Sequence, residues 1–164
     1  MHLPRDKKII LYAPTFRDDQ TTKKNKFVFD IQMDLHKMKK YLSDDYIILL
    51  RMHVVISNKI QVNESLSDFV KNVSNYSDIQ ELLLLSDILI TDYSSVMFDF
   101  ANTGRPMIFY TYDLENYRDN LRGFYMDFEK EVPGPLAFNT DDIIQSILNI
   151  DEITKRYSQK YKEF

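Results

Sequence analysis

Short apolar runs alternate with amphipathic and polar segments along the chain. Five runs rich in aliphatic or aromatic residues predict strands. They occupy residues 8–13, 46–53, 69–73, 88–90 and 107–110. The first and fourth runs are apolar at consecutive positions, which is typical of strands covered on both faces in a parallel sheet.

Helical spacing of apolar residues predicts helices between these strands. The predicted helices cover residues 31–42, capped by Asp30; 79–85, capped by Ser77 or Asp78; a short segment opened by Ser94 and Ser95; a segment beginning at Thr140; and residues 151–164. Residues 15–26 and 110–135 are expected to be long loops, the second with a helical turn near 114–120. The alternation predicts an α/β fold, a Rossmann-like, doubly wound, mainly parallel sheet with helices on both faces.

Composition narrows the class of protein. The 164 residues suit one domain covering 1–164, and the absence of cysteine excludes disulfides and thiolate metal sites. A net charge of −4 with scattered basic residues argues against a nucleic-acid partner. With 3 glycines and no Gly-x-Gly-x-x-Gly or Walker pattern, the chain does not fit dinucleotide oxidoreductases or P-loop nucleotidases. Without a membrane span or signal peptide in the sequence, a soluble, cytoplasmic protein is expected.

The segment 86–100 carries the clearest chemical signal. A predicted strand at 88–90 is followed by a turn and then by Ser94 and Ser95, where a helix is expected to open. Free amides, the positive end of the helix dipole and two hydroxyls would meet there, which favours phosphate binding. The alternative is that these serines only cap the helix. The turn at 103–106 and the next strand complete a βαβ unit, and ligands of such sheets bind at strand carboxyl ends.

Three predicted loops at strand carboxyl ends carry the other reactive side chains. The candidate phosphate-binding residues are Thr15, Arg17, Arg51, Asp92, Ser94 and Ser95, and the candidate catalytic residue is His53. Arginine grips phosphate in forked geometry, and a histidine can give a hydrogen bond or a proton to a leaving phosphate, so this set suits a diphosphate. Structural alternatives are a strand-end ion pair for Arg51, a packing role for His53 and a turn or cap role for Asp92. No protein-held metal and no cofactor are expected.

The order and spacing of these motifs resemble the CDP-glycerol glycerophosphotransferases of teichoic acid synthesis, specifically their carboxyl-terminal nucleotide-binding half. The matching motifs are Tyr-Ala-Pro-Thr-Phe-Arg at 12–17, Leu-Arg-Met-His at 50–53, Ser-Asp-Ile-Leu-Ile-Thr-Asp-Tyr-Ser-Ser at 86–95 with Phe98 and Asp99, Gly-Arg-Pro at 104–106, and Gly-Pro at 134–135 ahead of Asp141 and Asp142. The family is similar to GT-B glycosyltransferases, in which two Rossmann-like domains close over a cleft and the second holds the nucleotide donor.

The resemblance implies a donor site and a reaction. CDP-glycerol would lie across the three loops, with its diphosphate on Ser94, Ser95 and the helix start and with His53 as the donor-side histidine. A hydroxyl of a lipid-linked polymer would attack the glycerol-linked phosphorus, and CMP would leave. The family's other essential histidine belongs to the amino-terminal half and has no match here. The chain is therefore expected to be a fragment that binds the donor weakly and does not catalyse transfer alone.

Partners and location follow from the same resemblance. The polymer acceptor would bind through the missing half, and the parent protein would attach peripherally to the inner face of the bacterial cell membrane. No direct membrane contact is expected from this segment, which has no long basic amphipathic helix. Three alternatives stay open: a sugar transferase or nucleotide-sugar epimerase of the same architecture, a CDP-ribitol ribitolphosphotransferase, and a non-enzymatic nucleotide-binding or docking module.

Overall fold

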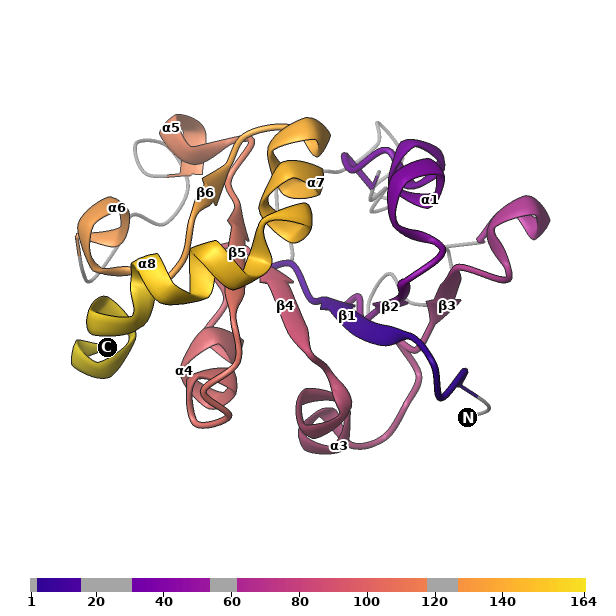
Figure 1. Cartoon of the computed structure of the whole chain (residues 1–164), viewed down its shortest axis with the longest axis horizontal. Coiled ribbons are helices and arrows are strands. Elements are labelled where there is room, and N and C mark those ends of the chain that lie inside the picture. The colour runs from indigo at the N-terminus through magenta and orange to yellow at the C-terminus, as the bar shows by residue number, and fades with distance from the viewer. Residues whose placement is uncertain (1–2, 16–30, 54–61, 118–126) are drawn as a thin grey trace, which may run out of the picture.

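A computed structural model of the chain describes residues 3–15, 31–53, 62–117 and 127–164. Within these ranges six strands form one sheet in the order β3-β2-β1-β4-β5-β6 (Figure 1). Their bounds are β1 (Lys8–Tyr12), β2 (Tyr46–Leu50), β3 (Val70–Asn72), β4 (Ile88–Thr91), β5 (Met107–Tyr110) and β6 (Leu136–Ala137). Every neighbouring pair is parallel, which confirms the predicted parallel sheet.

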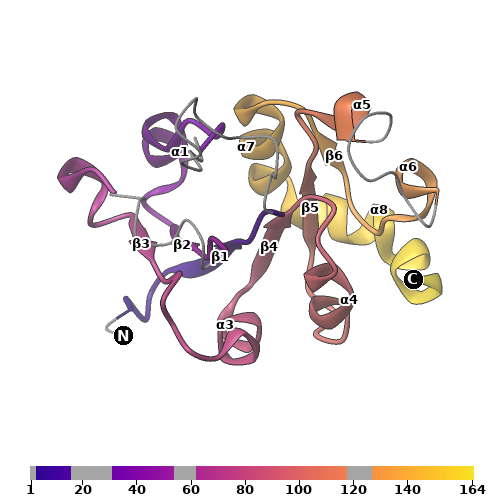
Figure 2. The same ribbon diagram turned by 180° about the vertical axis from the view of Figure 1, so that it is seen from behind.

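Helices cover both faces of this sheet (Figures 1 and 2). On one face lie α1 (Leu35–Leu42) and α7 (Thr140–Leu148), and on the other lie α3 (Ile79–Leu85) and α4 (Val96–Ala101). The remaining helices are η1 (Glu64–Leu66), α5 (Leu114–Asn116), α6 (Phe128–Glu131) and α8 (Ile150–Glu163). The Rossmann-like, doubly wound architecture is confirmed.

The core forms two layers because successive strand residues point to opposite faces. Ile10 and Tyr12 pack into the cluster that includes α1 and α7. Ile9 and Leu11 pack into the cluster that includes α3 and α4. All four side chains are buried, which explains why β1 is apolar at consecutive positions.

The predicted start of helix α1 is wrong, whereas helix α7 begins at Thr140 as predicted. Helix α1 begins at Leu35 rather than near residue 31. The side chain of Asp34 caps this helix, because it accepts a hydrogen bond from the backbone amide of Lys37. The cap predicted at Asp30 lies outside the described residues. Helix α7 is capped by Asn139, which precedes Thr140 and accepts from the amide of Asp142. Asp78 caps α3, one of the two residues predicted for that position.

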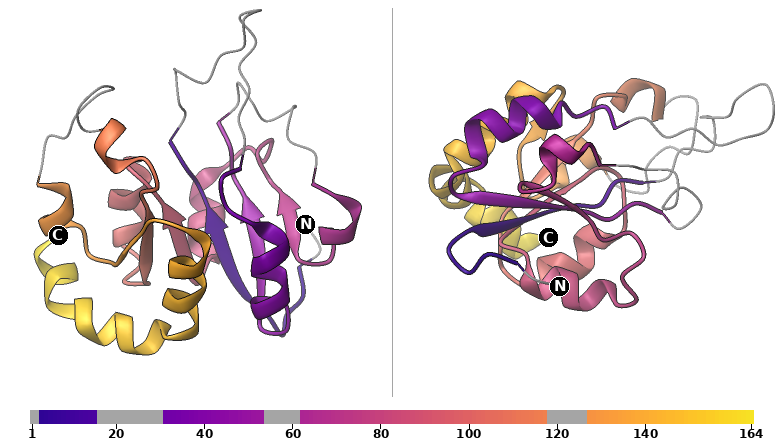
Figure 3. Two further views of the ribbon diagram at one scale, coloured as in Figure 1. Left: turned by 90° about the horizontal axis from the view of Figure 1, so that it is seen from above. Right: turned by 90° about the vertical axis from the view of Figure 1, so that its right-hand side faces the viewer.

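Helix α8 passes from one face of the sheet to the other (Figure 3). Its first residue, Ile150, packs with the α1 and α7 cluster, whereas Tyr161 and Phe164 pack against the α3 and α4 cluster. The Tyr161 hydroxyl donates a hydrogen bond of 2.8 Å to the carbonyl of Arg105. Burial raises the pKa of Tyr161 to about 12, so this donor stays protonated even at a pH where an exposed tyrosine ionises. No helix in the described part of the chain has both the length and the apolar character needed to cross a bilayer.

The backbone at Gly134 lies very close to β5. A Cβ atom at this position would lie 2.1 Å from the Met107 carbonyl oxygen and 3.1 Å from Cε2 of Phe109. Backbone cannot yield as a flexible side chain does, so we expect Gly134→Ala to lower the free energy of unfolding by about 2 kcal/mol. Urea denaturation measures this change.

Gly104 is the matched control for that substitution. It has a φ of +68° but no atom within 4 Å of an added Cβ. Alanine at this position would therefore cause backbone strain but no steric clash. Gly104→Ala should cost about 1 kcal/mol. If Gly134→Ala cost no more than Gly104→Ala, the close approach to β5 would not be as tight as described.

Candidate functional site

The strand order places a topological switch point between β1 and β4. The chain proceeds from β1 outward to β2 and β3, and then returns to the other side of β1 as β4. In open α/β sheets the crevice at the carboxyl ends of the two strands flanking such a point is where ligands bind. Thr15 follows β1, and Asp92 to Ser95 follow β4, so two of the three predicted loops border this crevice.

A pair of side-chain contacts joins these two loops. The backbone amide and the hydroxyl of Thr15 both donate to Oδ1 of Asp92, at 2.8 and 2.6 Å. The Thr91 hydroxyl donates to the carbonyl of Ala13 at 2.7 Å. Asp92 is only 2% exposed, and its carboxylate serves as an acceptor that holds the β1 loop against the end of β4. We interpret Asp92 as a positioning residue, while the phosphate-binding role of Thr15 stays a prediction.

Ser94 and Ser95 lie at the start of α4, as the sequence predicted. Ser95 is the N-cap residue and is exposed, yet its side chain makes no capping hydrogen bond in the described structure. The Ser94 hydroxyl is half-buried and accepts a long hydrogen bond of 3.4 Å from the amide of Val96. A purely capping role therefore does not account for Ser95, and its hydroxyl can be offered to a ligand. Phosphate binding by the two serines stays a prediction.

Arg51 has a structural role that neither sequence interpretation named. Its Nη1 donates to the carbonyls of Val73 at 3.1 Å and Tyr76 at 2.7 Å, and also to that of Ser74. The guanidinium thus holds the turn after β3 against the end of β2, rather than pairing with a carboxylate. Three protein carbonyls already use this nitrogen, so the phosphate-binding role predicted for Arg51 is not needed to explain the residue.

His53 is exposed and follows the buried Met52 beyond the carboxyl end of β2. Strand β2 neighbours β1, so His53 lies on the same edge of the sheet as Thr15 and the Ser94 loop. Its catalytic role stays a prediction. Arg17 lies outside the described residues.

Tyr93 in the β4 loop packs against two aromatic rings that the sequence pattern did not predict. The Tyr93 ring stacks on Tyr117 at 4.0 Å between centroids and meets the edge of Phe128 at 5.3 Å. Its hydroxyl donates to Oδ1 of Asp113 at 3.1 Å. The segment between 110 and 135 is rich in aromatic residues, which could have indicated this packing. Because these residues show no helical or strand periodicity, the sequence predicts only a loop there.

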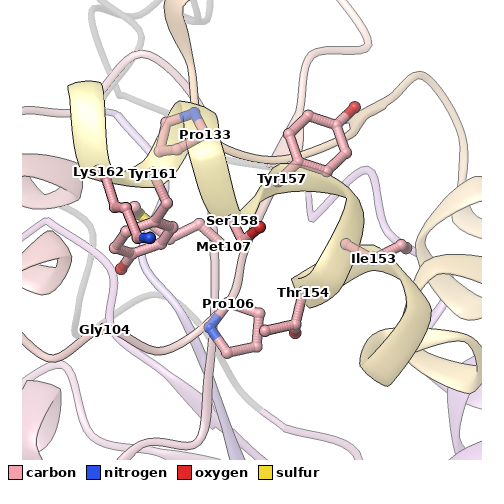
Figure 4. A pocket seen from close by; sticks show the side chains of 10 residues that line it. All are labelled: Gly104, Pro106, Met107, Pro133, Ile153, Thr154, Tyr157, Ser158, Tyr161 and Lys162. Carbon is pink, nitrogen blue, oxygen red and sulfur yellow. The ribbon is translucent and has the colours of Figure 1, made fainter.

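A hollow under α8 lies away from this edge (Figure 4). It measures about 230 Å³ and is lined by residues that include Pro106, Met107, Tyr157 and Tyr161. Pro106 and Met107 stand at the amino end of β5, opposite the edge that carries Ser94. Its apolar side chains and its position exclude it from the candidate site.

The all-parallel sheet, its switch point and the polar loops beside it define a Rossmann-like α/β domain of the type that binds ligands at strand carboxyl ends. The model of the CDP-glycerol:poly(glycerophosphate) glycerophosphotransferase family matches residues 1–164. The chain belongs to this family, which confirms the resemblance seen in its motifs.

Known relatives agree with this assignment. The chain is 49% identical over 157 residues to a teichoic acid glycerol-phosphate transferase of Staphylococcus aureus, covering 96% of this chain and 40% of that protein. It is 51% identical over 150 residues to a teichoic acid poly(glycerol phosphate) polymerase of Bacillus subtilis, covering 92% and 20%. The solved wall teichoic acid polymerase TagF superposes with a TM-score of 0.89 at 45% identity, covering 98% of this chain and 39% of that one. The chain thus spans two fifths or less of these relatives.

Proposed function

We propose that the chain is the donor-binding domain of a CDP-glycerol:poly(glycerophosphate) glycerophosphotransferase. The enzyme would transfer glycerol phosphate from CDP-glycerol to a teichoic acid chain and release CMP. The observation that carries this proposal is the family match over residues 1–164. The names of the relatives support glycerol phosphate rather than a sugar as the transferred group.

The candidate loops supply a consistent mechanism. An acceptor hydroxyl oxygen forms a bond to the glycerol-linked phosphorus, the bond from that phosphorus to the oxygen of CMP breaks, and the hydroxyl loses its proton. Ser94, Ser95 and the amides at the start of α4 hold the diphosphate, and His53 gives a hydrogen bond or a proton to the departing CMP phosphate. Positioning of the reacting groups and electrostatic stabilisation of the developing charge are the main contributions a protein makes to phosphoryl transfer.

The acceptor would be a lipid-linked polymer that binds outside this domain. A lipid-linked acceptor requires the complete enzyme to work at the inner face of the bacterial membrane by peripheral attachment. This domain then contributes the donor, and a partner domain contributes the acceptor and the base that takes its proton.

Calorimetric titration of the chain tests the proposal. We expect binding of CDP-glycerol and CMP, weaker binding of CDP-ribitol and no measurable binding of UDP-sugars at the same concentrations. Tighter binding of a UDP-sugar would contradict the proposal and support a sugar transferase or epimerase.

Transfer itself is tested by joining the chain to the amino-terminal part of the Staphylococcus aureus relative. The joined protein should release CMP from CDP-glycerol and a primer, whereas the chain alone should not. Release by the chain alone at the rate of the joined protein would show that it is more than a donor-binding domain.

A further inference from the structure

The backbone that leads into His53 is held by a buried serine. Met52 directly precedes His53, and its amide donates a hydrogen bond of 3.0 Å to the hydroxyl of Ser74. Ser74 lies two residues beyond β3 and is only 5% exposed. Serine is mostly found at protein surfaces, so a buried serine at this position requires an explanation.

The register of the sheet shows what this hydroxyl replaces. Strands β2 and β3 are parallel, and the amide of Val73 donates to the carbonyl of Leu50 at 2.9 Å. If the ladder continued evenly, the carbonyl of Val73 would accept the next bond, from the amide of Met52. The chain turns here instead, and that carbonyl accepts from the amide of Tyr76 at 2.9 Å. The hydroxyl of Ser74 therefore supplies the acceptor that the ladder no longer provides.

The position of Ser74 is itself fixed by its neighbours. Its amide donates to Oδ1 of Asn72 at 3.0 Å, and its hydroxyl lies 3.4 Å from the carbonyl oxygen of Leu50, to which it donates. Nη1 of Arg51 donates to the carbonyl of Ser74 as well as to that of Val73. The turn that carries the hydroxyl is thus tied to the end of β2 by bonds in both directions.

Strand β1 holds the other side of the same backbone. The amide of Arg51 donates to the carbonyl of Tyr12 at 2.9 Å. The two residues between β2 and His53 are therefore held from β1 and from the turn after β3. Because consecutive Cα atoms are about 3.8 Å apart, these bonds restrict where the backbone of His53 can lie relative to the loop that follows β1.

We infer that Ser74 is a positioning residue for His53, acting through the amide of Met52. The inference rests on the proposed function, in which His53 assists the departing CMP phosphate, and it adds the residue that sets the place of that histidine. Ser74 is buried and acts on the backbone, so it has no role in touching the donor. Small displacements of a reacting group are costly, and about 1 Å can lower a rate about 100-fold.

Ser74→Ala removes the acceptor and leaves the volume of the side chain almost unchanged. In the chain joined to the amino-terminal part of the Staphylococcus aureus relative, it should lower the kcat of CMP release about tenfold. The KM for CDP-glycerol should stay within about twofold, because the serines and amides at the start of α4 still hold the diphosphate. A rise in KM with an unchanged kcat would contradict a role through His53.

Ser86→Ala is the matched control. Ser86 is 0% exposed, and its hydroxyl donates to the carbonyl of Leu82 at 2.6 Å. It lies just before β4, at the opposite edge of the sheet from His53. Both alanine variants should lower the thermal midpoint by about 3 °C, but Ser86→Ala should keep kcat within about twofold. Equal losses of kcat in the two variants would mean that stability, rather than the place of His53, causes the effect.

A ligand-free measurement tests the positioning itself. The imidazole proton signals of His53 in the chain, followed by NMR, should move in Ser74→Ala and stay in place in Ser86→Ala. Unchanged signals in Ser74→Ala would overturn the inference, whether or not the chain binds a nucleotide.

A double-mutant cycle separates this inference from the proposed function. We expect His53→Ala to lower kcat about 100-fold, and Ser74→Ala to add less than about twofold to that loss. If Ser74→Ala lowered kcat tenfold in the His53→Ala background as well, Ser74 would not act through His53 and only the inference would be wrong. If His53→Ala left kcat unchanged, the role of His53 in the proposed function would fail and the inference would fail with it.

Discussion

Ser95→Asp will weaken the binding of CDP-glycerol by at least about 100-fold without lowering the stability of the domain. Two like charges about 4 Å apart repel by roughly 4 kcal/mol near a protein surface, so a carboxylate beside the diphosphate is strongly unfavourable. Aspartate is nevertheless a good N-cap residue, and a negative charge favours a helix N-terminus. Ser95 is the N-cap of α4 and its own side chain makes no capping bond in the described structure, so nothing structural is lost. Calorimetry and thermal denaturation measure the two effects separately.

Asn63→Asp is the matched control. Asn63 is the exposed N-cap of η1, next to β3 at the far edge of the sheet, and its substitution adds the same charge. We expect CDP-glycerol affinity within about twofold of the native chain for this variant. Similar losses in both variants would mean that net charge, rather than the position of Ser95, governs binding.

Asp92→Ala is expected to lower the free energy of unfolding by about 3 kcal/mol. Asp92 is 2% exposed, and its Oδ1 accepts two hydrogen bonds from Thr15. Hydrogen bonds to charged groups contribute about 1.5–3 kcal/mol, and the substitution leaves the Thr15 amide without this acceptor. Because the β1 loop loses its attachment to β4, donor binding should weaken as well. Urea denaturation gives the stability change.

Two further substitutions define the origin of that loss. Thr15→Val removes the hydroxyl but keeps the amide bond to Asp92, so it should cost about 1 kcal/mol. The double variant should cost less than the sum of the two single changes, since both remove the same contact. Asp99→Ala removes an exposed carboxylate from the same segment and should change stability by less than about 0.5 kcal/mol. An effect of Asp92→Ala as small as that of Asp99→Ala would contradict the positioning role.

The fold could be predicted because its signals are local and repeated. Strands such as β1 and β2 are apolar on both faces, and only a sheet covered by helices on both sides buries them. The ends of the helices were harder to predict, because a helix cap depends on which side chain reaches a free backbone amide. Asp34 caps α1 and Asn139 caps α7, whereas the sequence pattern predicted Asp30 as the first of these caps. Strand β6 has two residues, too few for any period to appear.

The candidate site was predictable in its location but not in its contacts. Parallel strands bring their carboxyl ends to one edge, so Thr15, Asp92 and Ser94 could be placed together from the strand assignments alone. The bond between Thr15 and Asp92 spans 77 positions, and no local pattern predicts it. Arg51 shows the same limit, since residue type suggested phosphate or carboxylate partners whereas the fold supplied carbonyls.

A crystal structure of this chain soaked with CDP-glycerol tests the proposed donor site most directly. Diphosphate oxygens should lie within hydrogen-bonding distance of the Ser94 and Ser95 hydroxyls and of the His53 imidazole at the same time. A diphosphate bound elsewhere, or one held by the serines with His53 out of reach, would contradict the shared donor site.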